Sequence, residues 1–161
     1  MRISVRRHTA GVAVTQQLAR LPLERLGACR ASVADLDAVC SLTALASTEY
    51  LDLNWAPAEL VAAAVAANVE AARITSLRRA FEGDFEVNPE YREVPDTIWE
   101  QPVNAVEPGG VAEIAHALRE IPLDVFERFA SPHGLPAFFT ALLGFYETAA
   151  QQGLAIAMWW D

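Results

Sequence analysis

The chain has 161 residues, of which 53% are hydrophobic and 20% charged, and this composition predicts one compact globular domain. Its formal net charge is −9 and its isoelectric point is about 4.8, so we expect no nucleic-acid or membrane partner, whereas a basic protein partner is compatible and solubility alone also explains the charge. All 12 basic residues are arginine, which excludes Schiff-base enzymes such as pyridoxal enzymes and lysine aldolases, as well as P-loop nucleotide hydrolases.

The first elements mix strand and helix patterns. Residues 2–6 alternate between polar and apolar side chains, which predicts a half-buried strand. Residues 12–20 predict a helix that stops before the following proline. Ser32 is a typical helix N-cap with Asp35 in the first turn, and that helix is expected to reach Ser47.

The centre of the chain contains the longest helical pattern. Residues 50–55 predict a short, turn-rich connector, after which Pro57 opens a helix. The apolar side chains change face along this pattern, so we expect a break at residues 73–75 and a stop at Gly83. Residues 84–107 then predict an irregular segment with one or two short edge strands, one of them near residues 98–106.

The C-terminal part has the clearest periodicity. Apolar residues predict a helix at 111–118, a short one at 123–129 and a long one from Leu135 that ends at Gly153. In the last segment, residues 154–161, both faces are apolar, which predicts an interior strand covered on both sides. We therefore expect an α+β fold: a single domain over residues 1–161, with a small mixed sheet that includes an N-terminal and a C-terminal strand and about five to six helices.

Cysteine usage and the apolar runs indicate where the protein resides. Cys29 and Cys40 do not have metal-site spacing, and Cys40 lies on an apolar helical stripe, which favours a buried free thiol over a disulfide. The apolar run at residues 10–14 is too short for a signal peptide, and no run reaches transmembrane length. We expect a cytoplasmic protein.

The C-terminal segments resemble a known family. They comprise Val-Asn-Ala-Val-Glu-Pro at 103–108, the helix at 111–118, Phe-Tyr-Glu-Thr-Ala-Ala at 145–150 and the strand at 153–159. Together with Tyr-Leu-Asp-Leu at 50–53, they are similar to the YfbM-like family, also called DUF1877. This resemblance implies an α+β domain without an agreed activity. The chain departs from the family's pattern after residue 53, where the lysine and the histidine are missing.

One helix face carries residues of the types that bind metals. Glu113, His116 and Glu120 are neighbours on a helix, but a di-iron site needs a second such pair, and Arg119 opposes a cation. We therefore interpret this face as solvated and predict no metal site and no cofactor.

The best candidate site combines polar and aromatic residues. Asp52, Asn54 and Trp55 lie in one connector, where an aromatic ring beside polar groups is typical of a pocket mouth. His133 lies in a Ser-Pro-His-Gly loop, either as an acid–base group or as an ordinary loop residue. Tyr50 and Trp99, with Tyr91, are candidates for an exposed aromatic patch.

These features favour a non-catalytic module that binds another protein, of which a toxin-neutralising, immunity-type role is one version. The alternative is a small-molecule-binding protein or small enzyme with a pocket near Asp52, Asn54 and Trp55. Either form is compatible with a monomer or a homodimer. The known nucleophile and metal-ligand motifs are missing from the sequence, which lowers the expectation of catalysis without removing it.

Overall fold

The structure is a computed structural model and describes residues 15–93 and 102–161. These residues form an α+β domain, which confirms the expected fold class. The strands are β1 (Gln16–Leu21), β2 (Tyr50–Asn54), β3 (Phe85–Glu86), β4 (Asn104–Val106) and β5 (Ala155–Trp160). They form one sheet in the order β2-β1-β5-β4-β3, and every described pair is antiparallel, so the expectation of a mixed sheet was wrong.

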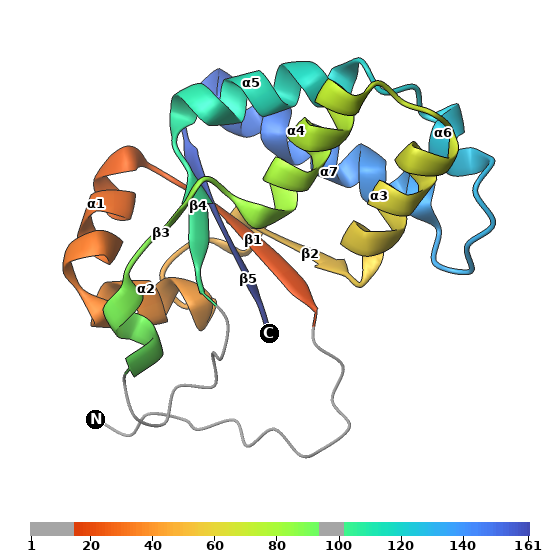
Figure 1. Ribbon diagram of the computed structural model, residues 1–161. Coiled ribbons are helices and arrows are strands. Elements are labelled where there is room, and N and C mark those ends of the chain that lie inside the picture. Colours follow the sequence, from red (N-terminus) through yellow and green to blue (C-terminus); the bar gives the residue numbers. More distant parts are fainter. Residues whose placement is uncertain (1–14, 94–101) are drawn as a thin grey trace.

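Helices cover both faces of this sheet (Figure 1). The α-helices of the described residues are α1 (Leu23–Ala31), α2 (Val33–Cys40), α3 (Ala56–Ala66), α4 (Ala71–Glu82), α5 (Pro108–Arg119), α6 (Asp124–Glu127) and α7 (Leu135–Gln152). Two 3-10 helices, η1 (Ser47–Glu49) and η2 (Pro89–Glu93), complete the set. Helices α1 and α2 lie on one face, and α3, α4, α5 and α7 lie on the other.

The central strand β5 is buried on both faces, as predicted. Ile156 and Met158 pack into the larger hydrophobic core, which the sheet forms with α3 to α7. Ala157 and Trp159 pack into a second core with α1, α2 and η2. Because β5 pairs with β1 on one side and β4 on the other, its backbone hydrogen bonds are also satisfied within the sheet.

Two strands were not predicted from the sequence. Residues 16–21 were expected to be helical and form β1, and residues 50–54 were expected to be a connector and form β2. The two strands pair with each other, and β1 also pairs with β5 along its whole length. Such partners are distant in sequence, and tertiary context overrides weak local preference. The strand predicted at residues 2–6 lies outside the described residues.

Local signals identified several helix ends correctly. The Ser32 hydroxyl accepts a hydrogen bond from the Asp35 backbone N–H at 3.2 Å, which is the predicted N-cap. Gly83 and Gly153 end α4 and α7 with positive φ angles of 72° and 63°. Helix α2 ends at Cys40, however, and not near Ser47.

The long central helical pattern is broken earlier than predicted. Helix α3 ends at Ala66 and α4 begins at Ala71, whereas the break was expected at residues 73–75. Asn68 has a φ of 54° in the turn between them. Asparagine tolerates this left-handed conformation better than most residues, so it supplies the turn that the apolar pattern did not reveal.

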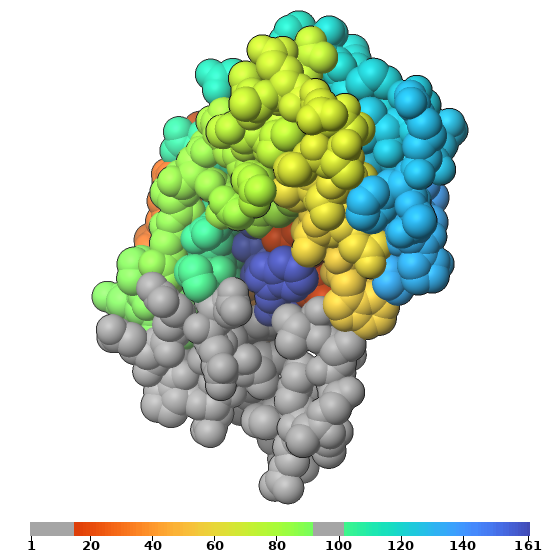
Figure 2. All heavy atoms as spheres, turned by 45° about the vertical axis from the view of Figure 1, so that its right-hand side comes forward, coloured from red at the N-terminus to blue at the C-terminus, as the bar shows by residue number. Residues whose placement is uncertain are grey.

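Both cysteines are free thiols in the second core; the burial of Cys40 was expected, and Cys29 is buried as well. An edge strand was predicted near residues 98–106; the described residues there form β4, which begins at Asn104 and lies between β5 and β3, so it is an interior strand and β3 forms the edge. On the face of the sheet that α3 to α7 cover, α3, α4 and the segment that contains α6 lie side by side (Figure 2).

Among the described helices, none has the length and apolar character needed to cross a membrane.

Candidate functional site

The candidate site begins where β2 passes into α3. Asn54 ends the strand with a φ of 50°, and its backbone N–H donates to Asp52 Oδ1 at 2.7 Å. Trp55 is the N-cap residue of α3, with Pro57 in the first turn. The chain therefore turns sharply at Trp55, and 49% of this residue is exposed to solvent. Among the large hydrophobic residues that are exposed in the described part of the chain, Trp55 is the one aromatic residue.

A histidine from a distant loop lies beside this tryptophan. His133 lies between α6 and α7, just before Gly134, which has a φ of 66° and is the N-cap of α7. The His133 backbone N–H donates to Ser131 Oγ at 3.1 Å. Its ring Nδ1 lies 2.9 Å from Glu59 Oε1 of α3. Because an ionised carboxylate only accepts hydrogen bonds, Nδ1 carries the proton in this pair.

The two rings form the walls of a small recess, which we call the Trp55 recess. The Trp55 and His133 ring centroids are 6.1 Å apart and their planes are inclined by 44°. The recess has a volume of about 130 Å³ and is lined by Asn54, Trp55, Ala56, His133 and Phe138. Three predicted site residues, Asn54, Trp55 and His133, therefore line the same hollow.

Glu59 holds the loop against α3. Hydrogen bonds from Ser131 and from His133 lower the pKa of this carboxyl below its ordinary value, so it is ionised over a wider pH range. Sequence reasoning missed Glu59, although its position four residues after Trp55 places both on one side of α3. Ser131 donates to the same carboxylate as His133, so serine and imidazole are not arranged as a nucleophile and its base.

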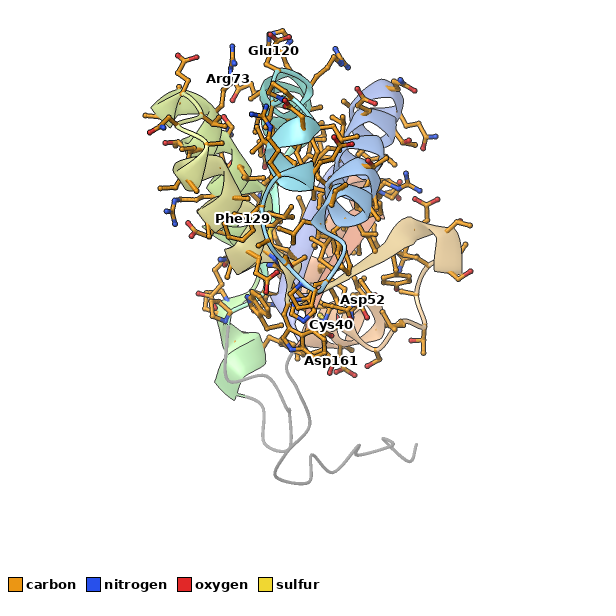
Figure 3. The ribbon with its side chains drawn as sticks, turned by 90° about the vertical axis from the view of Figure 1, so that its right-hand side faces the viewer. Cys40, Asp52, Arg73, Glu120, Phe129 and Asp161 are labelled. Carbon is orange, nitrogen blue, oxygen red and sulfur yellow. The ribbon has the colours of Figure 1, made fainter. Side chains whose placement is uncertain are left out.

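The other predicted site residues do not line the recess. Asp52 is exposed, and in Figure 3 it lies at the end of the molecule opposite Arg73 and Glu120. Tyr50 is half-buried on the side of the second core, where its hydroxyl donates to the Val39 carbonyl at 3.1 Å and its ring meets the Trp159 ring edge-on. Trp99 lies outside the described residues.

The expected exposed aromatic patch is not formed as predicted. Only 1% of Tyr91 is exposed, and its hydroxyl donates to Asp37 Oδ1 at 2.9 Å. Tyr91 comes from η2, which packs over α2, so its ring fills the second core. An irregular segment with scattered aromatics thus provides core contacts as well as surface, which its sequence pattern does not distinguish.

The helix face that carries Glu113, His116 and Glu120 is exposed to solvent, in agreement with the interpretation made from the sequence. Glu113, His116 and Glu120 are all exposed on α5. Glu113 pairs with Arg79 at 2.8 Å, and Glu120 lies 3.9 Å from Arg73. Within residues 15–93 and 102–161, no three histidine, cysteine or acidic side chains are grouped to hold a metal ion.

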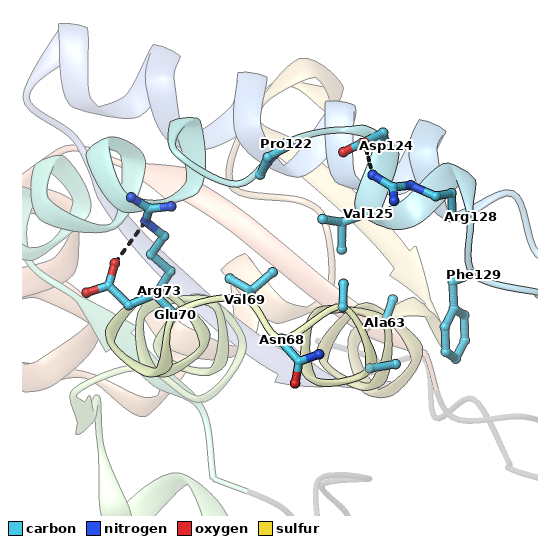
Figure 4. A pocket seen from close by; sticks show the side chains of 12 residues that line it. Ala63, Asn68, Val69, Glu70, Arg73, Pro122, Asp124, Val125, Arg128 and Phe129 are labelled. Carbon is cyan, nitrogen blue, oxygen red and sulfur yellow. Dashed lines mark hydrogen bonds and ion pairs between the residues drawn. The ribbon is translucent and has the colours of Figure 1, made fainter.

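A larger hollow, which we call the Phe129 groove, was not predicted from the sequence. It lies between the α3–α4 turn and the segment that leads into and through α6, and its volume is about 610 Å³ (Figure 4). The Glu70–Arg73 and Asp124–Arg128 ion pairs stand at its sides, with apolar residues between them. The groove is formed by segments about 60 residues apart, and we find no motif that would have revealed it.

No protein-family model matches the sequence, and no curated protein or solved structure shows significant similarity to the chain. The resemblance to the YfbM-like family therefore stays a prediction.

Proposed function

We propose that this protein is a non-catalytic cytoplasmic module that binds another protein through the Trp55 recess. The observation that carries the proposal is the half-exposed Trp55 ring at the edge of a preformed hollow. Tryptophan is one of the residues enriched among the anchors of protein interfaces, because it contributes a large contact area at a low cost in conformational entropy.

The size of the recess favours a protein partner over a metabolite. Sites for small molecules usually enclose about 300–1,000 Å³. At about 130 Å³, the Trp55 recess is large enough for one side chain of a partner, not for a whole cofactor or substrate. A small pocket that receives one side chain is typical of the centre of a protein interface.

The recess is also held in place before a partner binds. Glu59 accepts hydrogen bonds from His133 and Ser131, which fixes the loop against α3. Asp52 accepts a hydrogen bond from the backbone N–H of Asn54, which also lines the recess. Ordering these groups in advance removes part of the entropic cost of association.

The net charge of −9 supports a basic partner. Opposite charge accelerates association and makes it depend on salt concentration. Neutralisation of a basic toxin, an immunity-type role, is one form that such binding takes.

The test compares Trp55→Ala with a matched control, Leu23→Ala, because Leu23 is 50% exposed but belongs to α1 on the other face of the sheet. Each variant and the wild type are immobilised and exposed to an extract of the source organism at low and high salt. We expect a stoichiometric basic protein that the wild type and Leu23→Ala retain at low salt and Trp55→Ala does not. Equal retention by all three proteins, or none by any, contradicts the proposal.

A small-molecule-binding protein or small enzyme is the second candidate. The Glu59–His133 pair favours it, because Nδ1 is occupied and Nε2 is left as a proton acceptor beside the recess. A metabolite that raises the melting temperature of the wild type, but not of His133→Gln, would support this candidate. The same metabolite acting on both proteins would place its site elsewhere.

A further inference from the structure

We propose that the Trp55 recess recognises an arginine side chain of the basic partner, with the guanidinium stacked on the indole and paired with the Glu59 carboxylate. This inference rests on the proposed function and specifies the chemical group that the site binds. It combines three observations: Trp55 is half-exposed, the Glu59 carboxylate is bonded to His133, which lines the recess, and the recess has room for an aliphatic stem.

The aromatic lining suits a planar cation. Of the aromatic side chains, tryptophan attracts a cation to its ring face most strongly, and a guanidinium group also stacks on it. Phe138 and Ala56 provide apolar surface against which the three methylene groups of an arginine can lie. The described part of the chain places no lysine or arginine in the lining of the recess.

The carboxylate of Glu59 supplies the charge. Its two oxygens accept one hydrogen bond each, from His133 and from Ser131. A carboxylate oxygen has two acceptor positions, so both oxygens can receive a further N–H from a guanidinium. The Glu59 side chain retains 31% of its exposure, so an arriving side chain has access to it.

The alternatives to this occupant are less compatible with the charges. An acidic side chain would approach Glu59 in a protein whose net charge is already −9. An aliphatic side chain fits the hollow, but it gains nothing from the Glu59 carboxylate or from the attraction of the indole for a cation, and its binding does not depend on salt.

The experiment follows the tryptophan indole N–H signals of the whole protein. The chain has four tryptophans, so four indole N–H signals are expected in a ¹H–¹⁵N spectrum, and Trp55→Phe identifies the one from Trp55. The probes are N-acetylarginine methylamide and N-acetylcitrulline methylamide, which have nearly the same shape but differ in charge. Both are titrated at pH 8, where an ordinary histidine is neutral.

We expect the arginine amide to shift the Trp55 signal progressively and the citrulline amide to bind about five-fold more weakly, as expected for an exposed cation–π contact. Glu59→Gln should weaken binding of the arginine amide by a similar factor, whereas Glu120→Gln, which removes the same charge just after α5, should not. The amide spectrum of each variant shows whether it is folded.

Two results overturn the inference. Equal shifts from both amides show that charge is not recognised, and the absence of a shift from the arginine amide shows that the group does not bind. Either result, together with capture of a partner that still depends on Trp55, leaves the proposed function standing. Loss of that capture as well rejects both.

Discussion

Gly83 provides the sharpest stability prediction in this fold. It ends α4 with φ 72° and ψ −177°, a backbone conformation that is almost restricted to glycine. A Cβ atom at this position would lie 2.7 Å from Met158 Sδ, 2.9 Å from Asn104 Cβ and 3.1 Å from the Ala105 backbone nitrogen. The last two atoms belong to β4, whose pairing with β5 prevents it from moving away.

We expect Gly83→Ala to lower the free energy of unfolding by about 2–6 kcal/mol. Backbone strain accounts for about 1–3 kcal/mol of this loss and the steric overlap for a similar amount. Since small domains are stable by about 5–15 kcal/mol, such a loss is easily measured by urea denaturation followed by circular dichroism.

Two other glycines separate the contributions. Gly153 has a positive φ of 63°, but a Cβ atom added there would have no neighbouring atom within 4 Å. Gly153→Ala should therefore lower the free energy of unfolding by only about 1–2 kcal/mol. Gly144 lies in α7, is exposed and also has open space, so Gly144→Ala should stabilise the protein by about 0.5–1 kcal/mol. If Gly83→Ala loses no more stability than Gly153→Ala, the reasoning about the crowding against β4 is refuted.

Three further predictions concern single side chains. Hydrogen bonds lower the pKa of Glu59, so its contribution to stability is present above the ordinary pKa of glutamate and is lost as the pH falls through the lowered value. The difference in unfolding free energy between the wild type and Glu59→Gln should therefore shrink over that acid range. A difference that stays constant with pH would contradict this prediction. Burial raises the pKa of Cys40 well above its ordinary value, so a thiol reagent should modify it only after urea unfolds the protein, and rapid reaction of the native Cys40 would be inconsistent with its burial. The buried Tyr146 hydroxyl donates to the Ala80 carbonyl at 2.9 Å, so Tyr146→Phe should cost about 0.5–1.5 kcal/mol in thermal unfolding, and an unchanged melting temperature would show that this bond contributes nothing.

The sequence predicted those elements whose signals are local. The Ser32 cap, the stops at Gly83 and Gly153 and the apolar stripe of α7 each depend on residues within a few positions of one another. The burial of both faces of β5 also followed from its own residues, because apolar side chains on both sides of a strand require cover on both sides.

The site could be predicted only in part. The polar and aromatic residues around Trp55 indicated a pocket mouth, and Asn54, Trp55 and His133 do line one recess. Glu59 was missed because a glutamate on a helix usually faces solvent, and only the loop from residue 131 gives this one hydrogen-bond partners. No local pattern specifies a contact between residues more than 70 positions apart.

The sequence by itself thus determined the fold class, the helix ends at Ser32, Gly83 and Gly153 and the double burial of the last strand, since these follow from short-range periodicity and from glycine and serine chemistry. Tertiary structure decided that residues 16–21 and 50–54 form strands, because their stability comes from pairing with each other and with β5. It also decided where His133 lies, because the position of a loop depends on the packing of the helices that it connects and not on its own residues.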